Sequence, residues 1–134
     1  MYLTITLGLV VLTSLVSIAA FQDRKTFEGL LFSPYAVQHR QQWYRLFSHG
    51  LLHADVMHLM VNMFVLWSLG GAVELLYPIT SPLPAGVAYV ALYLGGMLFA
   101  TLPGMAKYRN NPSYRSVGAS GAVSAVVFAQ VVML

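Results

Sequence analysis

The sequence contains no cysteine and very little charge, and each absence narrows what the protein can be. Without cysteine the chain can form no disulfide bond. Only 8% of its 134 residues are charged, whereas soluble proteins carry about 25%. The net charge of +3 comes from short loops and not from a basic patch. A soluble domain and a nucleic-acid-binding protein are therefore both disfavoured.

Hydrophobic residues take the place of charge, and they occur in long uncharged runs. They make up 58% of the chain, and crossing a bilayer takes about 20 consecutive, mostly apolar residues. Four runs meet or approach that length, and they predict helices at about residues 2–21, 55–76, 85–102 and 118–134. We therefore expect one domain, residues 1–134, that is an all-α, polytopic transmembrane helix bundle.

The ends of these predicted helices are marked by capping and helix-breaking residues. Asp55 is placed to cap the start of the second helix. Pro103-Gly104 predicts the end of the third, and the proline-rich turn YPITSPLP separates the second from the third. No basic residue precedes the first run, so we interpret it as a retained helix and not as a signal peptide.

The first loop, about residues 22–54, is too aromatic for an ordinary linker. Its rings are mixed with arginines, a combination that favours the headgroup layer of a membrane. The rings belong to Phe27, Phe32, Tyr35, Trp43, Tyr44 and Phe47. We expect this loop to be partly helical and interfacial. All Lys and Arg residues fall in this loop and in the third loop. In a chain with four membrane-spanning helices, the first and third loops lie on the same side of the membrane. The positive-inside rule assigns that side to the cytoplasm.

Polar side chains inside a membrane span are costly, and the second predicted helix carries the strongest set. His58 and Asn62 are four residues apart, so they share one helical face. Taken alone, they are explained by hydrogen bonds between helices. A metal site is another interpretation, with possible ligands His49, His53, Asp55 and His58. It is disfavoured because His53 and His58 face different sides and the zinc-protease pattern H-E-x-x-H is absent. We expect no metal and no cofactor.

The segment GASG, residues 118–121, allows two interpretations of Ser120. Glycine and alanine in a membrane helix usually serve close packing. Ser120, however, follows a polar loop and falls in the first turn of the predicted fourth helix, where backbone N–H groups are free and the helix dipole is positive. A serine there has both a hydroxyl and nearby donors for an oxyanion. If His58 and Asn62 face the same spot, their N–H groups would add further donors.

Taken together, the motifs of this sequence resemble those of the rhomboid family of intramembrane serine proteases. Tyr44-Arg45 is similar to the family's aromatic–arginine pair, and GASG fits its G-x-S-G motif. GGAVE, which ends at Glu74, is similar to the end of the family's second helix. HADVMHLMVN fits the pattern H-x-x-x-x-H-x-x-x-N at His53, His58 and Asn62. The resemblance covers nearly the whole chain, as helices 1–4 of a six-helix core.

The resemblance implies a role for each of these residues. Ser120 is the nucleophile, and His58, Asn62 and the Ser120 N–H bind the oxyanion. The supporting residues are His53 as a structural hydrogen bonder, Gly118 and Gly121 for close approach, Arg45 for the first loop, and Glu74 as a link from the second helix to its neighbours. The implied reaction is hydrolysis of a peptide bond in or near the transmembrane segment of a protein substrate.

The chain departs from the family in the general base, which is a histidine on the family's sixth helix. The four histidines of this sequence offer no replacement by analogy, and a serine without a base is a poor nucleophile. Ser124 stands where the family often has an aromatic ring stacked on that base. We therefore expect the N-terminal part of a protease, truncated within its fourth helix and inactive by itself.

Two other interpretations remain open. A catalytically inactive rhomboid-like protein would bind transmembrane clients, and a generic membrane protein would use the same polar residues for packing, so that Ser120 need not face His58 and Asn62. The family's orientation places the first and third loops outside the cytoplasm, against the charge count, and we follow the family. We expect a multi-pass protein of the bacterial inner membrane whose partners are membrane lipid and transmembrane protein substrates, with no nucleic acid and no metal.

Overall fold

The molecule is an all-α bundle within residues 4–80 and 82–133, which the structure, a computed structural model, describes. Its long helices are α1 (Thr4–Gln22), α5 (Val56–Thr80) and α6 (Ala85–Tyr108). A shorter helix, α7 (Ser120–Met133), follows the third loop. The predicted fold class is therefore confirmed. The expectations for residues 1–3, 81 and 134 lie outside the described residues.

Three of these helices are long and apolar enough to cross a membrane. The candidate spans are Ile5–Gln22, Val56–Leu76 and Gly86–Tyr108. α7 is apolar as well, but its 14 residues are fewer than the roughly 20 that a crossing needs. The hydropathy pattern thus located all four apolar helices.

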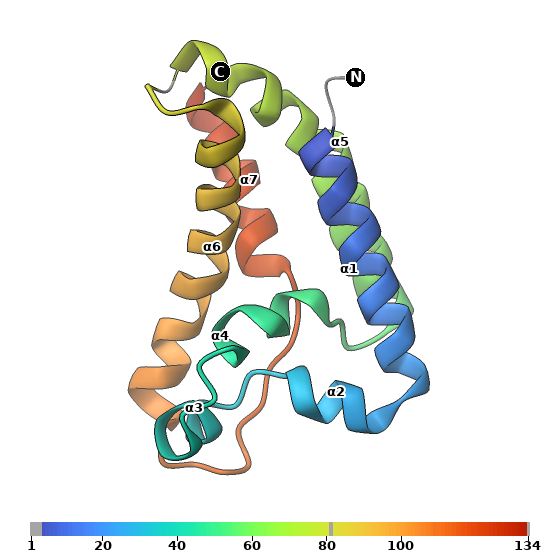
Figure 1. The fold of residues 1–134 in the computed structure, drawn as a ribbon, viewed down its shortest axis with the longest axis vertical. Coiled ribbons are helices and arrows are strands. Elements are labelled where there is room, and N and C mark those ends of the chain that lie inside the picture. Colours follow the sequence, from blue (N-terminus) through green and yellow to red (C-terminus); the bar gives the residue numbers. More distant parts are fainter. Residues whose placement is uncertain (1–3, 81, 134) are drawn as a thin grey trace.

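The bundle core lies where the four apolar helices meet. α7 packs against both α5 and α6, while α1 packs against α5 (Figure 1). The buried residues at the centre include Leu66, Tyr89, Tyr93, Ala122 and Val126. Gly96 lets α6 approach α7 closely, because a Cβ at that position would lie 2.9 Å from the Ala122 Cα. This packing fixes the position of α7 and of the serine at its start.

The first loop folds into short helices at the end of the bundle where α1 and α6 end and α5 begins (Figure 1). They are α2 (Arg24–Leu30), α3 (Pro34–Arg40), α4 (Arg45–Ser48) and the 3₁₀ turn η1 (His49–Leu51). An antiparallel bridge joins Phe32 of this loop to Ser116 of the third loop. The two basic loops therefore lie on the same side of the bundle, as predicted.

Two helices run past the prolines that were expected to end them. α6 continues through Pro103 to Tyr108, so its predicted end at Leu102 is corrected, and α5 continues through Pro78 to Thr80, beyond Leu76. A proline removes one helical hydrogen bond, but membrane helices tolerate this loss when neighbouring groups satisfy the freed carbonyl. α7 begins at Ser120, slightly later than predicted.

Candidate active site

Ser120 is the first residue of α7, where the third loop turns into the helix. The turn depends on Gly118, whose φ of 122° lies in the region that favours glycine. The Gly118 N–H donates to the His49 carbonyl at 3.0 Å. Further back, Phe32 and Ser116 exchange two backbone hydrogen bonds of 2.9 and 3.0 Å. The first loop therefore positions the backbone that leads to Ser120.

His58 and Asn62 approach this turn from α5. The Asp55 carboxylate caps the helix, because its Oδ1 accepts a hydrogen bond from the His58 N–H at 2.7 Å. The His58 ring lies against Gly118, with Cε1 3.0 Å and Nε2 3.5 Å from where a Cβ on that glycine would sit. Asn62 Nδ2 donates to the His58 carbonyl at 3.0 Å. This bond uses one of the two amide hydrogens and leaves the other without a partner among the described residues.

Asn62 and Ser120 line one groove of about 410 Å³ between α5 and α7. The rest of its lining is mostly apolar and consists of Val65, Val123, Ser124, Val127, Phe128 and Val131. Ser120 is exposed, and neither its Oγ nor its backbone N–H has a hydrogen-bond partner among the described residues. The groove therefore presents unused polar atoms between hydrophobic walls.

His53 lies behind His58 and is completely buried. The two rings meet edge to face, with their centroids 5.1 Å apart. Ser17 Oγ donates to the Leu51 carbonyl at 2.6 Å, so it accepts the hydrogen of His53 Nδ1, which is 3.0 Å away. Burial, with a smaller contribution from His58, lowers the pKa of His53 to about 4. His53 is thus a neutral ring held in one tautomer against His58.

Gly121 faces away from this groove and lies in the contact between α7 and α6. A Cβ at Gly121 would collide with the side chain of Ala100 and lie 3.1 Å from the Gly96 carbonyl oxygen. Gly121 therefore sets the distance between the two helices, which in turn holds Ser120 in place. Gly118, by contrast, lies beside the His58 ring.

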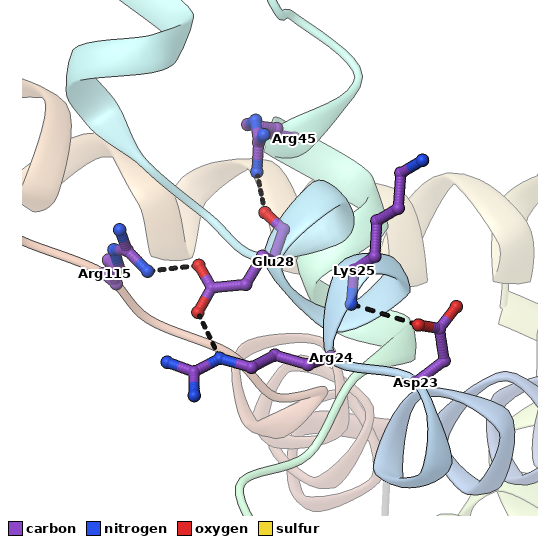
Figure 2. A network of polar contacts seen from close by, with 6 residues as sticks. All are labelled: Asp23, Arg24, Lys25, Glu28, Arg45 and Arg115. Atoms are coloured by element: carbon purple, nitrogen blue, oxygen red, sulfur yellow. Dashed lines mark hydrogen bonds and ion pairs between the residues drawn. The ribbon is translucent and has the colours of Figure 1, made fainter.

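Arg45 is part of the first loop and does not contact Ser120. Its Nη1 donates to the carbonyls of Glu28 (2.9 Å) and Leu31 (2.7 Å), and its Nε donates to Gln42 Oε1 at 2.7 Å. The bond to Glu28 is drawn in Figure 2. Because these acceptors belong to segments on both sides of α3, Arg45 holds the folded loop together.

Glu74 is also remote from Ser120 and acts on α1. Its carboxylate accepts hydrogen bonds from the backbone N–H groups of Ile5 (3.0 Å) and Thr6 (3.1 Å) and from the Thr6 hydroxyl (2.7 Å). The first N–H groups of a helix have no partner within it, so Glu74 caps α1 from a neighbouring helix. The Thr6 hydroxyl also lies 3.0 Å from the Tyr89 hydroxyl, which extends the contact to α6.

None of the four histidines hydrogen-bonds Ser120 in the part of the chain that the structure describes. His39 is 3.0 Å from Asn110 Oδ1 at the surface of the loops. His49 is buried, its Nε2 has no partner among the described residues, and burial lowers its pKa. The described residues also contain no group of three metal-ligating side chains.

Sequence analysis missed the partners of the supporting residues. Thr6 and Ser17, the partners of Glu74 and His53, are fully buried on α1. Thr13, also buried, lies on the same helical face by its spacing. Hydroxyl side chains that recur on one face of an apolar helix predict polar contacts with neighbouring segments, so the sequence did contain this signal. The bridge between Phe32 and Ser116 had no such signal, because it joins two irregular segments.

With this geometry in view, comparison with known proteins identifies the family. The model of the Rhomboid domain matches residues 40–134. The chain belongs to the rhomboid family. The matched segment of this rhomboid contains Ser120, His58, Asn62 and the supporting residues from Arg45 to Gly121, while α1 and α2 precede it. A search of curated proteins finds no significant match. Family membership and three apolar helices make the protein an integral membrane protein.

Proposed function

We propose that this rhomboid is an intramembrane serine endopeptidase that cleaves peptide bonds in or near the transmembrane helices of its substrates. The observation that carries the proposal is the convergence of Ser120, His58 and Asn62 from two helices. Ser120 and Asn62 line one groove, and the His58 ring lies beside the turn that leads into it. A generic packing role would not leave the Ser120 hydroxyl in that groove without a hydrogen-bond partner among the described residues.

In the proposed reaction Ser120 Oγ attacks the scissile carbonyl carbon, and the carbonyl oxygen takes up negative charge. The Ser120 N–H stands at the positive end of the α7 dipole and donates to this oxygen. The free hydrogen of Asn62 Nδ2 and a ring N–H of His58 complete the oxyanion hole. Donors held ready in this way are each worth about a 100- to 1,000-fold rate increase.

The same step requires a base for the Ser120 hydroxyl proton. The base returns this proton to the leaving amine as the C–N bond breaks, and water then hydrolyses the acyl-enzyme ester. His53 does not fit this role, because its Nδ1–H is bonded to Ser17 and the ring is buried behind His58. No base for this step is therefore assigned among the described residues.

The walls of the groove suit a transmembrane substrate. Val65, Val127 and Val131 give it an apolar lining next to the Asn62 amide and the Ser120 hydroxyl. An extended segment of a substrate helix would place its side chains against these valines and its carbonyl at Ser120. Lipid and transmembrane proteins are therefore the proposed partners.

A fluorophosphonate probe tests the proposal, because it reacts with serines that are activated as nucleophiles. In membranes containing the native gene product, we expect covalent labelling at Ser120 and none in the Ser120→Ala variant. Labelling of the 134-residue chain by itself is expected to be absent or very weak, because none of its described histidines hydrogen-bonds Ser120. A native gene product that folds but resists labelling would contradict the proposal.

That contrary result would favour a second candidate, a catalytically inactive rhomboid-like protein that binds transmembrane clients. The observation that favours this inactive client binder is that no histidine of the described residues hydrogen-bonds Ser120. A client binder would retain a transmembrane peptide equally well with Ser120→Ala, whereas the protease would accumulate uncleaved substrate only in that variant.

We also propose the bacterial inner membrane as the location, with the first and third loops outside the cytoplasm. Because the chain has no native cysteine, a single Ser113→Cys variant places a unique thiol in the exposed third loop. A membrane-impermeant maleimide should label it in intact spheroplasts. Labelling only after lysis would instead support the orientation that the charge count favours.

A further inference from the structure

A cavity of about 400 Å³ lies between the first and third loops. It shares no lining residue with the Ser120 groove. Three arginines, Arg40, Arg45 and Arg115, line it together with a single carboxylate, Glu28. Ser33 and Tyr35 contribute hydroxyl groups to the same lining. The cavity is therefore polar and carries a surplus of positive charge.

The carboxylate of Glu28 is already engaged. It forms ion pairs with Arg115 and, at 3.8 Å, with Arg24, as Figure 2 shows. Arg45 bonds only to neutral acceptors through its Nε and Nη1, which leaves its Nη2 without a hydrogen bond among the described residues. Arg40 is exposed and has neither an ion pair nor a hydrogen bond in that part of the chain. Two of the three arginines thus have no anionic partner within the described part of the chain.

The position of the cavity indicates which anion it meets. It lies at the end of the bundle where the spans of α1 and α6 end, at Gln22 and Tyr108. Exposed aromatic rings, Trp43 and Tyr44, immediately precede Arg45 in the same loop. Such rings mark the membrane–water interface. At that depth the abundant anion is the phosphate of phospholipid headgroups.

We propose that this cavity binds an anionic phosphate group, as carried by a phospholipid headgroup. Guanidinium groups match the geometry of phosphate oxygens, and Arg40 and Arg45 are the two lining arginines without an anionic partner among the described residues. The hydroxyls of Ser33 and Tyr35 can donate to the same oxygens. The proposal concerns lipid binding by the loops, and it holds whether or not Ser120 is a nucleophile.

Binding is measured by native mass spectrometry on the full chain in detergent, with three probes: dihexanoyl phosphatidylglycerol, dihexanoyl phosphatidylcholine and inorganic phosphate. We expect one molecule of lipid to be retained in saturable fashion, with the anionic phosphatidylglycerol held most tightly. Saturation by inorganic phosphate at the same concentrations would identify free phosphate as the ligand. Absence of saturable binding for all three probes would overturn the proposal.

Matched variants separate this cavity from general attraction of basic loops to anionic lipid. Arg40→Gln should weaken phosphatidylglycerol binding roughly fivefold, which corresponds to about 1 kcal/mol per basic residue at a lipid surface. Arg109→Gln removes the same charge from an exposed residue outside the cavity and should leave binding unchanged. Equal effects of the two variants would contradict a built site.

Glu28→Gln gives the opposite prediction. It removes the one carboxylate in the cavity and releases Arg115, so phosphatidylglycerol should bind roughly fivefold more tightly by the same reasoning. Weaker binding in a variant that still folds would mean that Glu28 organises the arginines and does not compete with an anion. That result would also overturn the proposal.

Discussion

α5 carries two clusters of polar residues with opposite character. In its second half Glu74 accepts three hydrogen bonds from Ile5 and Thr6, and the Thr6 hydroxyl lies 3.0 Å from that of Tyr89. At its start His58 and Asn62 approach Ser120, whose hydroxyl has no partner among the described residues. Both clusters place costly polar groups in apolar helices. The Glu74 carboxylate accepts hydrogen bonds at both of its oxygens, whereas among the described residues the Ser120 hydroxyl has no partner and the Asn62 amide donates only to a carbonyl of its own helix.

This difference distinguishes structural from functional polar groups. A buried polar group that has its hydrogen bonds stabilises the fold, and removing it leaves partners unsatisfied. A polar group in a groove without partners contributes little to folding, so its presence requires another explanation, such as a substrate. Variants of the Glu74 cluster should therefore lose stability, whereas variants of the Ser120 cluster should lose activity.

The largest expected effect is on catalysis, from Asn62→Ala. Loss of one oxyanion donor should slow fluorophosphonate labelling of the native gene product by about 100- to 1,000-fold. The free energy of unfolding should fall by less than about 1 kcal/mol, because the amide makes a single hydrogen bond within its own helix. A variant that labels normally would remove Asn62 from the site.

Glu74→Ala should have the largest effect on stability. Two backbone N–H groups and one hydroxyl would lose their acceptor, at a cost of about 3 kcal/mol in the free energy of unfolding. Glu74→Gln keeps one acceptor oxygen and should lose less. Unfolding in mixed detergent micelles measures both, and unchanged stability of Glu74→Ala would break the contrast between the two clusters.

Gly118→Ala should lower both the stability of the fold and the rate of labelling. A φ of 122° is unfavourable for alanine, and the added Cβ would sit 3.0 Å from His58 Cε1. We expect the free energy of unfolding to fall by about 2 kcal/mol, with slower labelling as His58 is displaced. Ala119→Gly, next in the chain, provides a control without positive φ. Equal labelling by both variants would contradict the role of Gly118.

The smallest expected effect is the pH dependence of stability through His53. Its pKa is about 4 in the folded protein and about 6.5 when unfolded. Between these values the unfolded chain binds more protons, so the thermal unfolding temperature should fall as the pH drops from 6.5 towards 4. His53→Gln should show a shallower dependence over that window. Identical slopes would show that His49 and other groups account for the effect.

The helices and the site residues could be predicted from the sequence to different extents. Long apolar runs located all four helices, because hydropathy is a local property. Their ends were less predictable: Pro78 and Pro103 lie inside α5 and α6, since a membrane helix tolerates the lost hydrogen bond. The cap from Asp55 to the His58 N–H was predictable, because capping depends on neighbouring residues.

Contacts between distant segments could not be predicted in the same way. The hydrogen bonds of Arg45 with Glu28 and Leu31, and the bridge between Phe32 and Ser116, depend on how irregular loops fold together. For the candidate site, sequence spacing put His58 and Asn62 on one face. The expectation that Ser120 shares their groove came from the family resemblance. Their proposed catalytic roles remain predictions.

The most direct measurement is a structure of the native gene product with a phosphonate bound covalently to Ser120. Our account predicts that the phosphoryl oxygen lies about 3 Å from Asn62 Nδ2, from a ring nitrogen of His58 and from the Ser120 N–H. The Glu74 contacts with Ile5 and Thr6 should be unchanged. A phosphoryl oxygen directed away from His58 and Asn62, towards lipid, would contradict the proposal that these residues form one catalytic site.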